Sequence, residues 1–168
     1  NRSVREFGLT DTALILDKTR EIVLQEFEKS EEEVKDGMDI ALCKLVGPHL
    51  FYSGANNPLW MIRNGGTEVE ETKANKQPIG KFDAPLPFSS HYFKVNKGDT
   101  FYIFSDGFAD QFGGPKGKKF KTANFKRLLL SIQGESMEHQ KELLEKAIND
   151  WRGPVEQIDD ICVIGFRL

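Results

Sequence analysis

The spacing of apolar residues changes from a helical period to a strand period near residue 38. In residues 12–29 apolar side chains recur on one helical face, with charged residues on the others. Thr10, Asp11 or Thr12 can supply the N-cap, because each carries a side-chain oxygen that accepts hydrogen bonds from the first free amides. The pattern therefore predicts an amphipathic helix over 12–29.

Beyond this helix, β-favouring runs alternate with turn signals. An acidic stretch leads into a predicted turn at Asp36-Gly37, and Gly47-Pro48 and Asn64-Gly65-Gly66 mark later turns. The strands predicted between the breaks are 38–46, 49–53, 59–63, 67–72, 91–95 and 100–105. The last of these is nearly all apolar or β-favouring, so we expect it in the buried centre of a sheet.

The final third of the chain returns to a helical pattern. A loop rich in glycine and lysine is predicted over 110–121, followed by helices over 123–133 and 137–151 and a last strand over 161–166. Strands and helices do not alternate regularly, which favours an α+β fold. No repeat or linker divides the sequence, so we expect residues 1–168 to form a single domain.

Composition narrows the functional classes. Of the 168 residues, 39% are hydrophobic and 29% are charged, and the net charge of the chain is −3. Lysine and arginine are not in excess, which argues against nucleic-acid binding. The basic cluster from Lys116 to Lys121 is interpreted as a solvated loop, with contact to an anionic partner as the alternative. No apolar run has the length of a membrane span, and the expected location is cytoplasmic.

The cysteines and the first residue give two further expectations. Cys43 and Cys162 lie in apolar, strand-like runs without metal-ligand spacing, so we expect buried, reduced thiols, although a disulfide stays open. The chain begins at Asn1 rather than at a methionine, which suggests a segment of a longer protein.

Two acidic motifs follow or precede buried strands. Asp106 comes after the strand 100–105, and Gly107 permits a sharp turn there, while Asp159 and Asp160 precede the last strand. An ionised Asp106 in an apolar setting would need a cation or hydrogen-bond donors to offset its desolvation. If Asp159 and Asp160 lie on a strand, they point to opposite faces, so only one enters a given site. Each motif alone is also compatible with a simple turn.

Carboxylates at strand ends are suited to a metal-dependent hydrolase. Mg²⁺ and Mn²⁺ prefer oxygen ligands. Two such ions about 3.5–4 Å apart can activate a water for in-line attack on phosphorus. Asp39, next to a predicted strand start, either orients such a water or caps a turn.

Four segments in this order resemble the SpoIIE/RsbU branch of the PPM metal-dependent serine/threonine phosphatases. The resemblance begins at about residue 35 and rests most on the two acidic motifs. The segments are Met38–Leu42, Ser53–Pro58, Phe104–Asp110 and Asp159–Val163.

The resemblance implies a sandwich of two antiparallel β-sheets flanked by helices, with a binuclear Mn²⁺/Mg²⁺ centre that hydrolyses phosphoserine or phosphothreonine on a protein. Asp106 and Gly107 match the Ser-Asp-Gly motif, of which Asp106 is the metal ligand. Asp159 matches the ligand at the final strand, and Asp160 takes the adjoining position where relatives carry Asn or Asp. Asp110 matches a position that contacts an additional, weaker metal in some relatives, or is a surface acid.

The sequence departs from the family at its first motif, Asp-x-x-Gly-His-Gly, which is absent. We therefore expect the N-terminal strands to be missing, metal binding by this chain to be weak or absent, and the chain alone to be nearly inactive. The alternative hypothesis is a pseudophosphatase that serves as a protein-interaction module.

The resemblance also implies partners. The usual substrate of this branch is a phosphorylated anti-sigma-antagonist protein, and the usual control comes from an upstream sensory or repeat region, which can attach the parent protein to a membrane. The helix 12–29 is in addition a candidate element for pairing with a second copy of the chain.

Overall fold

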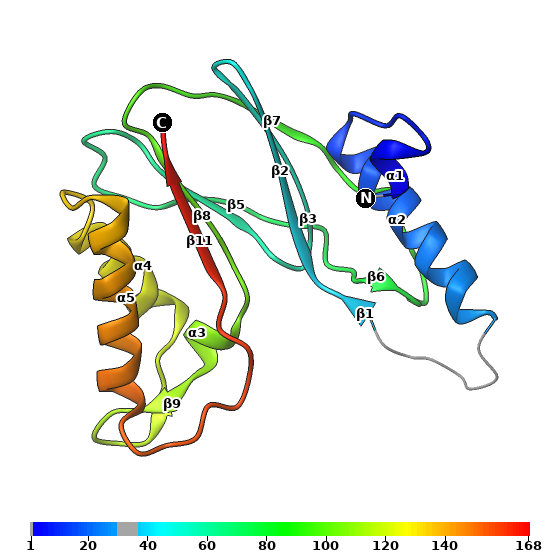
Figure 1. Cartoon of the computed structure of the whole chain (residues 1–168). Coiled ribbons are helices and arrows are strands. Elements are labelled where there is room, and N and C mark those ends of the chain that lie inside the picture. The colour runs from blue at the N-terminus through cyan, green and yellow to red at the C-terminus, as the bar shows by residue number, and fades with distance from the viewer. Residues whose placement is uncertain (1, 30–36) are drawn as a thin grey trace. The chain divides into compact units, whose positions relative to one another are not determined.

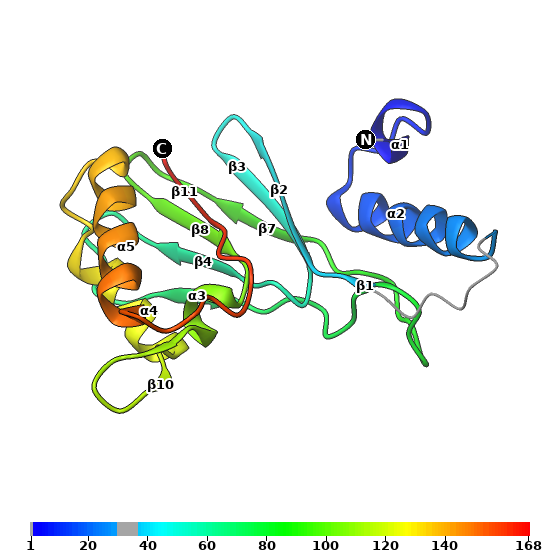
Figure 2. The ribbon, with the colours of Figure 1, turned by 60° about the horizontal axis from the view of Figure 1, so that its bottom comes forward.

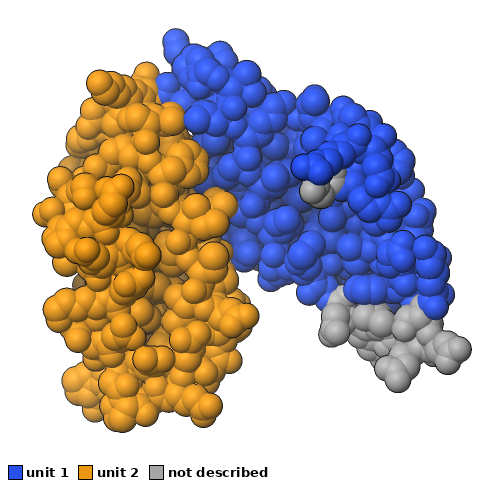
Figure 3. Space-filling view, in the orientation of Figure 1, with its two compact units in different colours: residues 1–59, 72–95 blue, residues 60–71, 96–168 orange. Residues whose placement is uncertain are grey.

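The computed structural model describes residues 2–29 and 37–168. Asp36 of the predicted turn Asp36-Gly37 and most of the acidic stretch before it lie outside the described residues, whereas Gly37 is described. The chain divides into two compact units, residues 1–59 with 72–95 and residues 60–71 with 96–168 (Figure 3). The prediction of a single domain over 1–168 stays a prediction.

The first unit begins with two helices, α1 (Arg2–Arg5) and α2 (Thr12–Phe27). Asp11 is the N-cap of α2, because its side chain accepts hydrogen bonds from the amides of Ala13 and Leu14 at 2.9 and 3.0 Å. The helix ends at Phe27, two residues before the predicted end. Its buried face carries Ala13 and Leu16, which pack in one apolar cluster with Ala55, Ile79 and Phe88.

Antiparallel pairing builds the strands of the first unit. β2 (Ile40–Val46), β3 (His49–Ala55) and β7 (His91–Lys94) form a three-stranded sheet with β3 in the centre, which confirms the predicted hairpin. The predicted strand 38–46 is interrupted at Asp39, and its first part, β1 (Gly37–Met38), pairs instead with β6 (Ile79–Gly80).

A four-stranded sheet organises the second unit. Its order is β11-β8-β4-β5, from β4 (Leu59–Ile62), β5 (Glu70–Thr72), β8 (Thr100–Phe104) and β11 (Val163–Arg167). β8 lies between two partners, as predicted for a buried strand (Figure 1). β5 is shorter than the predicted 67–72, because the chain bends at residues 67–68.

Short elements and two helices complete the second unit. The predicted loop 110–121 contains a hairpin of β9 (Phe112–Gly113) and β10 (Lys118–Lys119), and a four-residue helix, α3 (Gly107–Asp110), precedes it. The helices α4 (Thr122–Ser131) and α5 (Met137–Arg152) match the predictions within two residues. Gly153 ends α5 with φ 53°, a left-handed conformation that suits glycine.

Aromatic packing attaches α3 and α4 to this sheet. The Phe108 ring of α3 stacks on Phe125 of α4 with centroids 4.2 Å apart, and Phe125 also contacts Trp60 and Phe104. Phe108 and Phe125 are almost completely buried. The short helix is therefore held by its side chain rather than by its own few backbone bonds.

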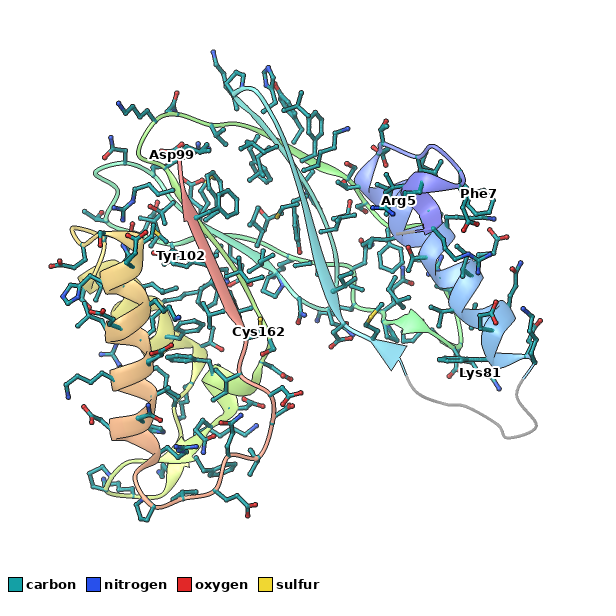
Figure 4. The ribbon with its side chains drawn as sticks, in the orientation of Figure 1. Arg5, Phe7, Lys81, Asp99, Tyr102 and Cys162 are labelled. Carbon is teal, nitrogen blue, oxygen red and sulfur yellow. The ribbon has the colours of Figure 1, made fainter. Side chains whose placement is uncertain are left out.

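The elements are helices and antiparallel sheets, which confirms the α+β class. Among the described residues no helix is long and apolar enough to cross a membrane. Both cysteines are free, but they are not both buried as expected: Cys43 is half-buried, and Cys162 is exposed just before the edge strand β11 (Figure 4).

Asp99 is a buried carboxylate that joins the turn before β8 to the segment after β4. It is 1% exposed, accepts hydrogen bonds from the amides of Asn64 and Asn96 at 2.9 and 3.0 Å, and pairs with Arg63 at 2.9 Å. Burial alone would raise its pKa, but these donors outweigh burial and lower the pKa.

We predict that Asp99→Asn lowers the free energy of unfolding by about 2 kcal/mol at neutral pH, because it weakens charge-assisted hydrogen bonds. The folded pKa lies below the unfolded value of about 3.9, so the carboxylate contributes above that value and loses its contribution as the pH falls through the folded pKa. Urea unfolding at a series of pH values tests this. The exposed Asp83→Asn is the control, and a gap between wild type and Asp99→Asn that persists unchanged in acid would contradict it.

The two thiols should differ in reactivity. Burial raises the pKa of the Cys43 thiol to about 11, and the thiolate is the reactive form. Cys162 is exposed. We predict that iodoacetamide modifies Cys162 well before Cys43 in the native protein, as followed by peptide mass spectrometry. Equal rates in the native protein would show that Cys43 is accessible.

Candidate functional site

The pairing of β8 with β11 brings the two acidic motifs to one end of the sheet. The strands are antiparallel, and Phe104 at the end of β8 lies opposite Val163 at the start of β11. The residues after β8 therefore meet the residues before β11. Figures 1 and 2 both show α3 beside the segment that enters β11.

Ser105 connects the two motifs through three hydrogen bonds. Its amide donates to the carbonyl of Cys162 at 3.0 Å and continues the strand pairing by one residue. Its hydroxyl donates to the carbonyl of Asp160 at 2.7 Å and accepts from the amide of Cys162 at 2.9 Å. One side chain thus fixes the backbone of the second motif against the end of β8.

Gly107 lets the two backbones approach closely. A Cβ at this position would lie 2.4 Å from the carbonyl oxygen and 2.9 Å from the carbonyl carbon of Asp160. Backbone atoms cannot move aside as a flexible side chain can, so any larger residue must push the motifs apart. Glycine is required here for space and not for an unusual φ angle.

Asp106 and Asp110 lie at opposite ends of α3. Asp106 is exposed at the N-cap position and makes no capping hydrogen bond with its side chain. Because Asp106 is exposed, it has no desolvation cost that a cation would have to offset. This differs from the apolar setting expected for a residue directly after a buried strand. Asp110 is half-buried and forms an ion pair of 2.6 Å with Lys119 of β10.

Asp159 and Asp160 do not lie on a strand. β11 begins only at Val163, so the expectation that alternation turns just one of the pair toward the site does not apply. Both residues are exposed, and the Asp159 carboxylate accepts a hydrogen bond from the amide of Asp160 at 2.7 Å. The preference for Asp159 as the metal ligand stays a prediction.

Asp39 belongs to the first unit. Its carboxylate accepts a hydrogen bond of 2.8 Å from the side chain of Asn56, which itself has a left-handed φ of 57°. This contact joins the residue before β2 to the turn after β3. A role for Asp39 in orienting a water is untested.

The donor chemistry of the second unit suits Mn²⁺ or Mg²⁺, since Asp106, Asp110, Asp159 and Asp160 all offer carboxylate oxygens. Their number and placement do not complete a site. Within residues 2–29 and 37–168 no three His, Cys, Asp or Glu side chains are grouped closely enough to hold a metal ion. These residues would therefore need further oxygen ligands to bind either ion firmly.

Sequence reasoning gave no role to Ser105 or Lys119. The signal for Ser105 was present, because a hydroxyl directly after a buried strand can bond the backbone of a neighbouring chain segment. Lys119 appeared only as part of a basic cluster, and its pairing with Asp110 depends on the β9–β10 hairpin.

Comparison with known proteins identifies relatives of the whole chain. The sequence model of the family described as stage II sporulation protein E (SpoIIE) matches residues 8–168. No curated protein matches the sequence. The solved SiaA-PP2C domain of Pseudomonas aeruginosa is similar with a TM-score of 0.85 and 26% identity, over 99% of this chain and 64% of that chain.

Two further solved structures share the fold at lower identity. The PP2C phosphatase domain of SpoIIE from Bacillus subtilis, with a fragment of its regulatory domain, has a TM-score of 0.70 and 18% identity over 99% of this chain and 46% of that chain. PppA, a key regulatory component of the T6SS in Pseudomonas aeruginosa, has a TM-score of 0.59 and 17% identity over 93% of this chain and 66% of that chain. The chain thus spans less than two thirds of the first two structures.

We predict that Gly107→Ala lowers the free energy of unfolding by about 1–3 kcal/mol, because the added methyl overpacks against the Asp160 backbone. Gly134→Ala is the matched control, since a Cβ at Gly134 meets nothing within 4 Å. Chemical unfolding of both variants measures the difference. Equal stability of the two variants would disprove the close contact.

Proposed function

This chain belongs to the SpoIIE family of PP2C-type, or PPM, phosphatase domains, and we propose that it hydrolyses phosphoserine or phosphothreonine on a regulatory protein of a bacterial signalling pathway. Its fold is the α+β fold of PP2C domains. The substrate, the metal and the level of activity of this chain belong to the proposal.

The observation that carries the proposal is the junction made by Ser105. It joins the Asp106 motif to the Asp159-Asp160 pair by side-chain and backbone hydrogen bonds. The two acidic motifs lie far apart in the sequence, and a pair of unrelated surface turns would have no reason to share such a connection. We propose that Asp106 and Asp159 are metal ligands of the reaction centre, with Gly107 allowing their approach.

Residues 1–168 supply only part of such a centre in this proposal. Asp106, Asp159 and, more weakly, Asp160 and Asp110 would hold Mn²⁺ or Mg²⁺ together with oxygen ligands from elsewhere. Mg²⁺ requires nearly octahedral oxygen coordination, so a site with few protein ligands binds it poorly. We therefore propose that the chain by itself has little activity.

The partners are inferred from the resemblance to this branch of the family. We propose a phosphorylated protein of the anti-sigma-antagonist type as the substrate, control by a sensory or repeat region of the same protein, and a cytoplasmic location. A pair of chains that associates through α2 is a further proposal, and the exposed Leu14 on this helix, 54% accessible, is consistent with it.

A second candidate function is a pseudophosphatase that only binds a partner. It is favoured by the absence of any group of three potential metal ligands in the described part of the chain. The presence of aspartate at positions 106, 159 and 160 favours the enzyme instead, because a binding surface has no need of these carboxylates.

Turnover of a phosphoserine peptide with Mn²⁺ separates the two candidates. We predict little hydrolysis by residues 1–168 and strong hydrolysis by the full-length protein that contains them, because the latter can complete the oxygen coordination. Absence of hydrolysis by the full-length protein with any tested phosphopeptide would favour the pseudophosphatase. Strong hydrolysis by residues 1–168 would refute the incomplete site.

We predict that Asp106→Asn in the full-length protein lowers kcat/KM by more than about 100-fold, which exceeds the usual effect of residues outside the metal ligands. Without metal, stability should hold or rise, because the substitution removes a negative charge near other carboxylates. Phosphatase assays with Mn²⁺ and thermal unfolding measure the two effects, with Asp150→Asn on α5 as the control. Unchanged kcat/KM would exclude Asp106 as a ligand.

A further inference from the structure

The segment that carries Asp159 and Asp160 has little apolar anchorage of its own. Residues 153–160, called the strap, link α5 to β11, and all of them are exposed. No helix or strand includes them. The position of the strap must therefore depend on particular hydrogen bonds rather than on burial in the core.

Side chains on both sides of α3 hold the strap. Before α3, the Ser105 hydroxyl donates to the carbonyl of Asp160 at 2.7 Å. After α3, the Gln111 side-chain amide donates to the carbonyl of Glu156 at 3.1 Å and to that of Phe112 at 3.0 Å. Ser105 directly precedes Asp106, and Gln111 directly follows Asp110.

Gln111 is anchored more firmly than a surface glutamine. It is fully buried, its amide donates to the carbonyl of Gly107, and its carbonyl accepts from the amide of Phe120 and the indole of Trp151. The residue thus joins α3, β9, α5 and the strap. Its Oε1 is buried without a hydrogen-bond partner.

We propose that Ser105 and Gln111 are positioning residues that hold the strap at two points, so that Asp159 and Asp160 keep a fixed place relative to Asp106 and Asp110. In this proposal both residues act through the backbone that carries the aspartates. Only the expected effect on catalysis rests on the proposed function, because the hydrogen bonds that hold the strap are part of the structure of this chain.

The bracketing arrangement supports this role. The two donors flank the five residues 106–110, and their acceptors, Glu156 in the middle of the strap and Asp160 at its end, enclose residues 157–159. Two anchors at separate points fix both the place and the direction of a segment, whereas one anchor would leave it free to rotate. The closeness of Gly107 to the Asp160 carbonyl adds a steric limit on the same side.

The first test measures order in the strap of residues 1–168 and needs no activity. Ser105→Ala and Gln111→Met each remove one anchor, and Ser105→Thr keeps the hydroxyl. Ser131→Ala, which removes a hydroxyl bonded to the Leu128 carbonyl within α4, is the control. We expect amide order parameters of Glu156–Asp159 to fall from about 0.85 toward 0.6 in the first two variants only.

Hydrogen exchange gives a second measure of the same effect. Ser105→Ala should speed exchange of the Cys162 amide at least tenfold, while exchange at Ile164 within β11 stays the same. Ser105→Thr should retain the protection. An ordered strap in both Ser105→Ala and Gln111→Met would overturn the proposal, as would a loss of protection across the whole of β11, since the effect would then be general destabilisation.

The catalytic consequence is measured on the full-length protein with a phosphoserine peptide and Mn²⁺. Loss of an anchor should lower kcat by about 10–100-fold, as for other residues that orient metal ligands, with a small change in KM and recovery in Ser105→Thr. A wild-type protein without phosphatase activity would refute the proposed function and leave the strap measurements valid. A disordered strap with unchanged kcat would refute the positioning role alone.

Discussion

The antiparallel register of β8 and β11 is the constraint on which the candidate site depends. Phe101 and Phe166 are paired in that register and their rings stack with centroids 5.0 Å apart. A slip of one residue would turn Phe166 to the opposite face of the sheet. It would also move the Asp160 carbonyl away from the Ser105 hydroxyl. Core packing of the sheet therefore helps to set the distance between the two acidic motifs, whose carboxylate-bearing residues Asp106, Asp159 and Asp160 are themselves exposed.

Elements with a strong local pattern could be predicted, and elements that depend on distant contacts could not. The helices α2 and α5 have clear caps at Asp11 and Ser136, and β8 is a continuous β-favouring run, so sequence and structure agree there within about two residues. In contrast, α3 has four residues and is held by Phe108 stacked on Phe125. A helix of this length has no periodic signal, because its stability comes from packing that the sequence does not display.

The meeting of the two acidic motifs could be predicted, but their local geometry could not, and the roles of their residues stay predictions. Resemblance to the family supplied Asp106, Asp159 and their order, and β8–β11 pairing places these motifs together as an α+β fold of this kind requires. Alternation along a strand was the wrong rule for Asp159 and Asp160, because Ser105 takes the amide of Cys162 and the carbonyl of Asp160 before regular pairing begins. Side-chain-to-backbone bonds of this kind leave no periodic trace in a sequence.

The exposure of the carboxylates explains why the hydrogen bonds from Ser105 and Gln111 to the strap matter. A buried carboxylate such as Asp99 is fixed by the donors that its burial requires, and these same donors lower its pKa. The carboxylates of Asp106, Asp159 and Asp160 are exposed to water, so burial does not restrict where they point. A cation, however, accepts ligands only within a narrow range of distances. A site made of exposed carboxylates must therefore obtain its precision from the backbone beneath them, which is where Gly107, Ser105 and Gln111 act.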